Sequence, residues 1–412
     1  MGEYVSIASR DGNTFQAYLA TPAAGTGPGM VVIQEIFGVN AYVRRTADRM
    51  AEEGYVVLAP DLFWRIEPGI DLSYSPEDWQ RAFELFGTFD VDKGIEDIAA
   101  TIDALRQRDD QSGGVGCVGY CLGGKLAFLT AARTDVDCAV AYYGVGMEAH
   151  ADEAANVTKP LMFHMAELDG FAPPASRDAV MTAFEGNPNA TFHVYPGQDH
   201  AFAREEGEHY DKPSALMAQD RTMELFHRCI GPVYDLSKLW DDHCTFEFAS
   251  RNVPDTMSTM VAEPYVNHVP TMTGGVGAQQ LSRFYQWHFV NANPADTKLI
   301  PISRTVGSSS VVDEMLFCFT HDREIDWMLP GIAPTGCYVE IPLVAIVKFR
   351  GDKLYNEHLH WDQASVLVQI GLLDPTGLPV AGIETARKLV DESLPSNGLM
   401  SAWASSEGKA IG

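Results

Sequence analysis

The chain has 412 residues, of which 46% are hydrophobic and 21% are charged, as is usual for soluble globular proteins. This length exceeds the range in which a single core keeps growing, so it predicts two domains. The 29 basic and 56 acidic residues give a net charge of −27, which disfavours nucleic acids and anionic membrane surfaces as partners. No run approaches the roughly 18–20 apolar residues of a membrane span.

Short apolar runs alternate with amphipathic stretches in the first half of the chain, which predicts βαβ units and a mostly parallel sheet. The expected strands are 4–8, 30–34, 55–59, 114–119, 139–143, 161–165 and 191–195. The expected helices are 42–53, 77–86, 91–105, 122–132 and 214–229. Because Gly231 and Pro232 then interrupt the pattern, we expect an α/β domain over residues 1–232.

Longer alternating segments follow from about residue 240. They predict strands at 244–249, 311–320, 338–349 and 353–361, with helices near 279–290 and 362–372. This mixture predicts an α+β domain over residues 233–395, built as a curved antiparallel sheet against a few helices. Residues 396–412, rich in Ser, Gly and Ala, are expected to form a flexible tail.

The seven cysteines are scattered without C-x-x-C spacing. This usage predicts neither a disulfide framework nor a zinc site, and it fits a reducing, cytoplasmic setting. We therefore expect no metal and no cofactor.

Cys121 stands out because of its surroundings in the segment Gly119-Tyr-Cys-Leu-Gly-Gly124, between a predicted strand and a predicted helix. This order is typical of a nucleophile elbow, here with cysteine in place of serine. A helix N-terminus favours the thiolate form of a cysteine, and the backbone amide of Leu122 is placed to stabilise an oxyanion. The alternative is a glycine-rich turn around a buried cysteine, which the order of strand, elbow and helix disfavours.

An acid and then a histidine should follow the nucleophile in this type of enzyme. Asp169 follows a predicted strand, and His200 lies in the loop after the last strand. We expect Asp169 to orient the His200 imidazole, which takes and returns the proton. Glu167 is an alternative acid, whereas His164, inside a strand, reads as a core histidine.

Three more segments of the first half stand out beside the elbow: Gln34-Glu-Ile-Phe-Gly-Val-Asn40, Tyr142-Tyr-Gly-Val-Gly146 and His200-Ala-Phe-Ala-Arg204. With these motifs, residues 1 to about 232 resemble the dienelactone hydrolase (carboxymethylenebutenolidase) family. The resemblance implies a triad of Cys121, His200 and Asp169, and an oxyanion hole formed by the backbone amides of Leu122 and Ile36. It also implies that Glu35 holds the resting cysteine as a thiol and takes its proton when substrate binds. The alternative for Glu35 is a loop or capping carboxylate.

The resemblance further implies that Arg204 grips a substrate carboxylate, for which its bidentate fork is suited. Trp79 stands where the family has a second arginine, and Phe83 where a tyrosine is usual. Arg81, two residues away, either compensates or is a solvated helix residue. Because of these two differences from the family, we expect the substrate to be a lactone or ester other than dienelactone itself.

The second half resembles the SnoaL-like polyketide cyclases of the cone-shaped NTF2-like fold. The resemblance rests on Glu263-Pro-Tyr-Val-Asn-His268, on the hairpin turn at Gly351 and on His358-Leu-His-Trp-Asp-Gln-Ala364. It implies a small-molecule pocket, acid–base catalysis or dimerisation. His268, His360 and Asp362 are candidates for acid–base groups in a pocket. Alternatively they form hydrogen bonds within the sheet, and Asp362 caps the last helix.

The leading hypothesis is a cysteine-dependent hydrolase that opens a small lactone or ester through an acyl-enzyme. One alternative is a binding or assembly protein whose triad is vestigial. Another is a bifunctional enzyme whose second domain isomerises the product of the first. The second resemblance also implies a homodimer through the C-terminal domain.

Overall fold

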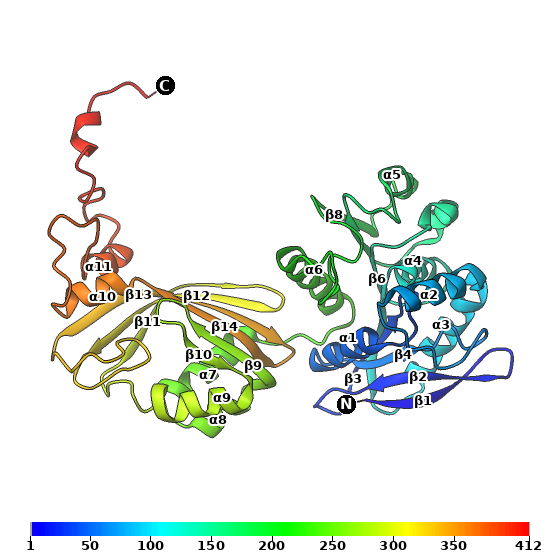
Figure 1. Ribbon diagram of the computed structural model, residues 1–412, viewed down its shortest axis with the longest axis horizontal. Helices are drawn as coiled ribbons and strands as arrows, with labels where there is room; N and C mark the ends of the chain where they lie inside the picture. The colour runs from blue at the N-terminus through cyan, green and yellow to red at the C-terminus, as the bar shows by residue number, and fades with distance from the viewer. Residues whose placement is uncertain (1, 412) are drawn as a thin grey trace. The chain divides into compact units, whose positions relative to one another are not determined.

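The computed structural model describes residues 2–411, and the chain divides into two compact units, Met1–Tyr234 and Asp235–Gly412. The first unit contains an eight-stranded sheet in the order β1-β2-β4-β3-β5-β6-β7-β8 (Figure 1). β2 is antiparallel to both of its neighbours, β1 and β4. The remaining neighbouring pairs, from β4 through β3 to β8, are parallel. The strands are β1 (Glu3–Ala8), β2 (Thr14–Ala20), β3 (Gly27–Ile33), β4 (Val56–Pro60), β5 (Gln111–Tyr120), β6 (Cys138–Tyr142), β7 (Leu161–Ala166) and β8 (Ala190–Tyr195).

Helices cover both faces of this sheet, which is why every residue of β3, β4, β6 and β7 is buried. One face packs against α3, α4 and α5, and the other against α1 and α6. The helices are α1 (Ala41–Glu52), α2 (Pro76–Thr88), α3 (Val91–Arg106), α4 (Leu122–Arg133), the 3-10 helix η1 (Met147–Asn156), α5 (Pro174–Ala183) and α6 (Lys212–Ile230). This arrangement confirms the predicted α/β architecture of the first half.

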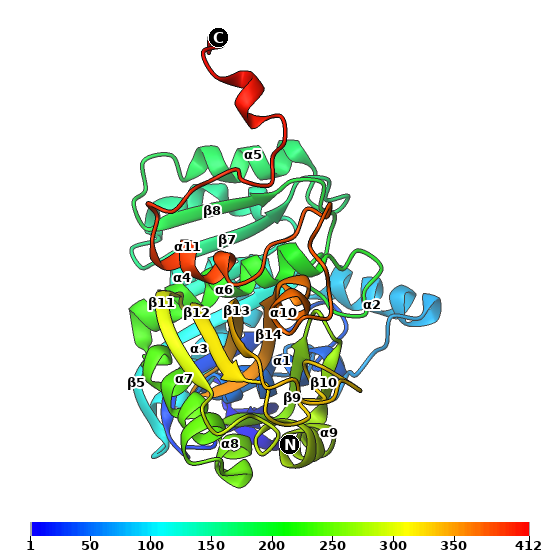
Figure 2. The ribbon, with the colours of Figure 1, turned by 90° about the vertical axis from the view of Figure 1, so that its left-hand side faces the viewer.

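The second unit is built on a six-stranded sheet in the order β10-β9-β14-β13-β12-β11 (Figures 1 and 2). Its pairs are antiparallel except for β14 and β9, which run parallel. From Val339 to Arg350 in β13, buried and half-buried residues alternate strictly, so one face of the sheet carries the core. The strands are β9 (Met260–His268), β10 (Thr273–Val276), β11 (Lys298–Val306), β12 (Ser310–Thr320), β13 (Tyr338–Arg350) and β14 (Lys353–Trp361).

Short helices complete this unit, several of them at the face that carries the core (Figure 1). α11 packs on the opposite face, where Ala386 contacts Leu316 and Cys318. The helices are α7 (Leu236–Cys244), the π-helix η2 (Thr245–Ala249), α8 (Val253–Ser258), α9 (Gly277–Phe284), the π-helix η3 (Tyr285–Phe289), α10 (Gln363–Gln369), α11 (Glu384–Val390) and the 3-10 helix η4 (Trp403–Ser406). Among the helices of residues 2–411, none has the length and apolar character that crossing a bilayer requires.

The predicted strand at 244–249 is wrong, because this segment continues α7 as η2. Apolar side chains at every second position of Cys244-Thr-Phe-Glu-Phe-Ala249 imitate a strand. The buried residues instead follow a helical spacing through Leu236, Trp240, His243 and Glu247. Two of these four are polar, and this hid the helical period from a hydrophobicity pattern.

Candidate active site

Cys121 lies at the sharp turn between β5 and α4, with an unusual backbone conformation of φ 57° and ψ −115°. Positive φ is rare for a residue with a side chain and is found where the surrounding structure enforces it. Here the enforcement comes from close packing: a Cβ on Gly119 would lie 1.9 Å from the carbonyl oxygen of Gly123. The turn places the half-buried Cys121 at the N-terminus of α4, where the amide of Leu122 has no partner within the helix.

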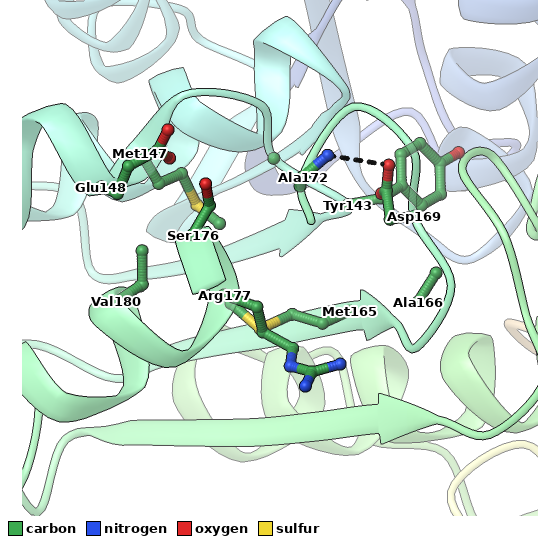
Figure 3. A pocket seen from close by; sticks show the side chains of 11 residues that line it. Tyr143, Met147, Glu148, Met165, Ala166, Asp169, Ala172, Ser176, Arg177 and Val180 are labelled. Atoms are coloured by element: carbon green, nitrogen blue, oxygen red, sulfur yellow. Dashed lines mark hydrogen bonds between the residues drawn. The ribbon is translucent and has the colours of Figure 1, made fainter. Parts of the chain in front are cut away.

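His200 and Asp169 form a buried pair beside this cysteine. The Nδ1 atom of His200 donates to Asp169 Oδ2 at 2.9 Å, and the two residues are 6% and 2% exposed. Asp169 also accepts hydrogen bonds from the backbone amide of Phe171 at 2.8 Å and from that of Ala172 at 3.0 Å. Figure 3 shows the second of these bonds. These bonds satisfy the carboxylate and fix the imidazole with Nε2 free to interact with Cys121.

The charge environment favours the imidazolium form of His200. Burial lowers the pKa of His200, but the charge of Cys121 and the hydrogen bond to Asp169 outweigh it and raise the pKa to about 10. Aromatic rings of Tyr143 and Phe171 meet the imidazole edge-on at 5.1 and 4.9 Å, which restricts its rotation. The pair is therefore held in one orientation, and beside a Cys121 thiolate it keeps its proton at neutral pH.

Glu35 is buried in the same region, with 1% of its surface exposed. Its carboxylate accepts from the hydroxyl of Tyr74 at 2.9 Å and from the guanidinium of Arg204 at 3.2 Å. Arg204 in turn lies over the ring of Tyr74, with 4.0 Å between the guanidinium carbon and the ring centroid. These contacts differ from the expected resting arrangement, in which Glu35 holds Cys121, because the carboxylate is engaged by an arginine and a tyrosine.

A cavity of about 280 Å³ opens beside His200 and Arg204. Trp79 and Phe171 line it and stack at 6.2 Å between ring centroids, with an interplanar angle of 10°. Phe83 lies 5.4 Å from the Trp79 ring and is 47% exposed. Trp79, Phe83 and Phe171 thus form an aromatic wall, of which Trp79 and Phe171 line the cavity.

Arg81 does not line this cavity. Its half-exposed guanidinium forms ion pairs with Glu67 and Glu84, as the solvated-helix alternative predicts. Glu167 is exposed and accepts from the amide of Gly197, so it is not the carboxylate that meets His200. His164 is a core histidine whose two ring nitrogens bond Tyr195 and Thr222.

The structure does not gather the three candidates of the second unit into one pocket. His268 is buried on β9 among aromatic rings, and burial lowers its pKa to about 3. His360 is exposed on β14. Asp362 is the N-cap of α10 and accepts from the amide of Ala364 at 2.9 Å, so its carboxylate has a structural task.

A different set of polar side chains is buried in this unit: His243, Glu247 and Glu357. The sequence pattern does not reveal them, because residues 244–249 have the alternation of a strand. The signal that was available is the four-residue spacing of His243 and Glu247, which in a helix puts both side chains on one face.

The fold and the elbow define an α/β-hydrolase. A profile of the dienelactone hydrolase family matches residues 15–230. A carboxymethylenebutenolidase homologue of Azospirillum brasilense is 45% identical over 230 residues, covering 55% of this chain and 99% of its own. The carboxymethylenebutenolidase of Pseudomonas putida is 41% identical over 224 residues, covering 54% of this chain and 95% of its own.

A dienelactone hydrolase homologue of Klebsiella pneumoniae with a known crystal structure is 27% identical, with a TM-score of 0.50, and covers 55% of this chain and 98% of its own. The chain therefore belongs to the dienelactone hydrolase family. It is a hydrolase that acts on ester or lactone bonds. The family match ends at residue 230, before the second unit begins.

Proposed function

We propose that the first unit opens a small lactone or ester through a triad of Cys121, His200 and Asp169. The observation that carries this proposal is the placement of His200. Its Nδ1 is bonded to buried Asp169, and its other side interacts with a cysteine at a helix N-terminus. Nucleophile, base and orienting acid thus occur in the arrangement that acyl transfer requires.

In the proposed reaction the sulfur of Cys121 attacks the substrate carbonyl carbon, and the backbone amides of Leu122 and Ile36 stabilise the oxyanion. His200 gives its proton to the departing alkoxide, so the ring of a lactone opens and an acyl-enzyme forms. His200 then takes a proton from water, which hydrolyses the thioester and releases the acid. Asp169 keeps the imidazole in the required tautomer throughout.

Glu35 and Arg204 are assigned to substrate recognition and to control of the cysteine. A substrate carboxylate at Arg204 would compete with Glu35, since both anions need the same guanidinium. A displaced Glu35 is then available to accept the proton of the Cys121 thiol. The ion pair of Glu35 and Arg204 at 3.2 Å and the opening of the cavity beside Arg204 support this assignment.

The aromatic wall indicates which class of substrate fits the cavity. Trp79, Phe83 and Phe171 offer flat apolar surfaces and no positive charge, so they favour a substrate with an unsaturated or aromatic part. We infer a lactone or ester that carries at most one carboxylate, bound at Arg204, and a planar group at the entrance.

For the second unit we propose the SnoaL-like, NTF2-like fold over residues 233–395, with residues 396–412 as a tail after the domain. Support comes from its six-stranded sheet, whose core face packs against short helices (Figure 1). We also infer a cytoplasmic homodimer through this unit. Val312 and Ile300 are 38% and 42% exposed on neighbouring strands and offer apolar surface for a second copy. Light scattering of Val312→Asp against wild type tests the dimer.

The experiment for the hydrolase is turnover of a panel of lactones and aryl esters, including a dienelactone. Cys121→Ala should lose at least about 10³-fold in kcat/KM with an unchanged circular dichroism spectrum. Cys229→Ala, a half-buried cysteine of the same unit, is the matched control and should retain activity. Undiminished turnover by Cys121→Ala would contradict the proposal. No observation favours the alternative, in which the protein only binds or assembles.

A further inference from the structure

The second unit contains a buried cluster of one histidine and two carboxylates that has no part in the proposed hydrolysis. His243, Glu247 and Glu357 are 0%, 3% and 2% exposed. One side-chain donor atom from each, either nitrogen or oxygen, lies within 4.8 Å of the other two. Imidazole and carboxylate groups are the usual ligands of divalent first-row transition metals in proteins.

Local backbone irregularities bring the three side chains together. His243 lies at the end of α7, and Glu247 follows in the π-helix η2, a conformation that is rare and often found at functional sites. Glu357 comes from β14, where a bulge lies between Leu354 and Asn356. Strict alternation from buried Leu354 would turn Glu357 outward, so the bulge is what aims this carboxylate into the core.

The hydrogen bonds of His243 fix which ring nitrogen faces the carboxylates. The hydroxyl of Thr259 donates to the carbonyl of Thr256 at 2.6 Å, so its oxygen is left to accept from His243 Nδ1, also at 2.6 Å. When the ring is neutral, its Nε2 atom therefore presents a lone pair to Glu247 and Glu357. Metal-binding histidines are oriented in this way, with the second nitrogen held by a protein acceptor.

The donor atoms converge on a common point instead of bonding one another. His243 Nε2 lies 3.1 Å from Glu247 Oε1 and 3.9 Å from Glu357 Oε2. Neither contact is aligned as a hydrogen bond: Nε2 of His243 and Oε2 of Glu357 are buried without a hydrogen-bond partner among the described residues. Three ligands at about 2.1 Å from one ion are separated by about 3.4 Å in a tetrahedral site, close to these distances.

Charge and space point to a cation as the occupant. With all three groups deprotonated, as metal binding requires, the cluster carries two negative charges, and within the described part of the chain neither carboxylate forms an ion pair with any residue other than His243. Burying such a charge without compensation is expensive. The adjoining cavity, lined by Glu247, Glu357 and apolar side chains, has a volume of about 20 Å³, enough for one water molecule.

A tyrosine hydroxyl is also buried beside the cluster. Tyr285, at the start of η3, is 1% exposed, and its hydroxyl lies beside Glu247 without a well-aligned hydrogen bond to any described residue. Its ring meets the His243 ring edge-on at 6.3 Å. This hydroxyl is available to bond a water molecule held by an ion at the cluster.

We propose that His243, Glu247 and Glu357 bind one divalent transition-metal ion of the Zn²⁺ class, with a water molecule as its fourth ligand. Three protein ligands and one exchangeable position are typical of sites at which a metal polarises a ligand or activates water, whereas structural zinc sites use four protein ligands. The site is independent of Cys121, so the hydrolase proposal and this one succeed or fail separately.

The test measures Zn²⁺ bound to the full-length, reduced protein after chelation, reloading and desalting. Wild type should retain one equivalent more than Glu357→Gln, which keeps the shape of the side chain but loses the charge. Zn²⁺ should raise the melting temperature of wild type and not that of Glu357→Gln. Glu263→Gln, an exposed glutamate on the neighbouring strand β9, is the matched control and should behave as wild type.

A gentler variant keeps the test decisive if Glu357→Gln does not fold. Thr259→Val removes the acceptor of His243 Nδ1 and should weaken Zn²⁺ binding about 10-fold or more at unchanged stoichiometry. Equal Zn²⁺ content and equal thermal response in wild type and Glu357→Gln would overturn the proposal. So would wild-type affinity in Thr259→Val, and either result would mean that protons alone hold the cluster together.

Discussion

Two buried histidine–carboxylate clusters of this chain differ in how fully their polar atoms are satisfied. In the first unit, Asp169 receives two backbone amides and the Nδ1–H of His200, and His200 interacts with Cys121. In the second unit, Glu357 has an oxygen without a hydrogen-bond partner among the described residues and shares one histidine with another carboxylate. The first cluster is complete as it stands, whereas the second leaves a ring nitrogen and a carboxylate oxygen without hydrogen-bond partners among the described residues.

The difference is also one of position in the fold. His200 and Asp169 lie on loops that follow strands of a parallel sheet, where a side chain reaches the substrate cavity. Glu247 and Glu357 lie inside the core, on a π-helix and a bulged strand. A loop site exchanges substrate readily, whereas a core site favours an occupant as small as an ion.

The largest expected effect follows from breaking the complete cluster. Asp169→Asn keeps the shape but lets the wrong tautomer of His200 form, and it should lower kcat/KM by about 10³–10⁴-fold. The measurement is steady-state hydrolysis of the best ester of the panel. Glu167→Gln, two residues away and exposed, is the control and should be nearly as active as wild type.

The pH dependence sharpens the same point. Because the pKa of His200 is raised to about 10, the imidazolium is retained at neutral pH and is lost as the pH rises through that value. Wild-type activity should therefore fall on the alkaline side near pH 10. In Asp169→Asn this limb of the pH profile should move to lower pH, because the carboxylate that favours the imidazolium is gone. If the alkaline fall in activity stays at the same pH in Asp169→Asn, a group other than His200 causes it.

An intermediate effect is expected at Glu35. Glu35→Gln leaves the guanidinium of Arg204, which is 12% exposed in its side chain, without a charged partner. Removing one member of a buried ion pair costs about 3 kcal/mol in the free energy of unfolding. Urea denaturation measures it, and Arg81→Gln, which breaks solvent-exposed ion pairs, should leave the midpoint nearly unchanged. A midpoint shift as small as that of Arg81→Gln would show that Arg204 does not depend on Glu35.

The smallest effect is expected from removing the second unit. Relatives that consist almost wholly of the first unit exist, so residues 1–234 should fold and hydrolyse the same esters at the wild-type rate. The measurement compares kcat/KM and the released products of the two proteins. A changed product would revive the bifunctional alternative, in which the second unit acts on what the first releases.

The sequence predicted the first unit well because its signals are local. The elbow around Cys121 occupies six consecutive residues, and buried strands of a parallel sheet are continuous apolar runs. What it left open was the partner of each charged group. The pairing of Glu35 with Arg204 joins residues 169 positions apart. For Arg81, spacing alone does not distinguish a substrate-binding arginine from a solvated helix residue.

In the second unit the misread segment is instructive. Period-two alternation in 244–249 favoured a strand, and in a strand His243 and Glu247 would lie far apart. Helical geometry makes them neighbours, but the bulge that turns Glu357 inward has no hydrophobic signal of its own. His268, His360 and Asp362 lie in recognisable motifs, but the structure buries His268 among aromatic rings, exposes His360 and uses Asp362 as a helix cap.

The central claim is that Cys121 forms the acyl-enzyme. The most direct measurement is mass spectrometry of the protein quenched in acid during turnover of a slow aryl ester, followed by peptide mapping. The acyl mass should appear on the peptide that contains Cys121 in wild type and should be absent from Cys121→Ala. An acyl group on any other residue, or rapid turnover with no acylated Cys121 at any time, would contradict it.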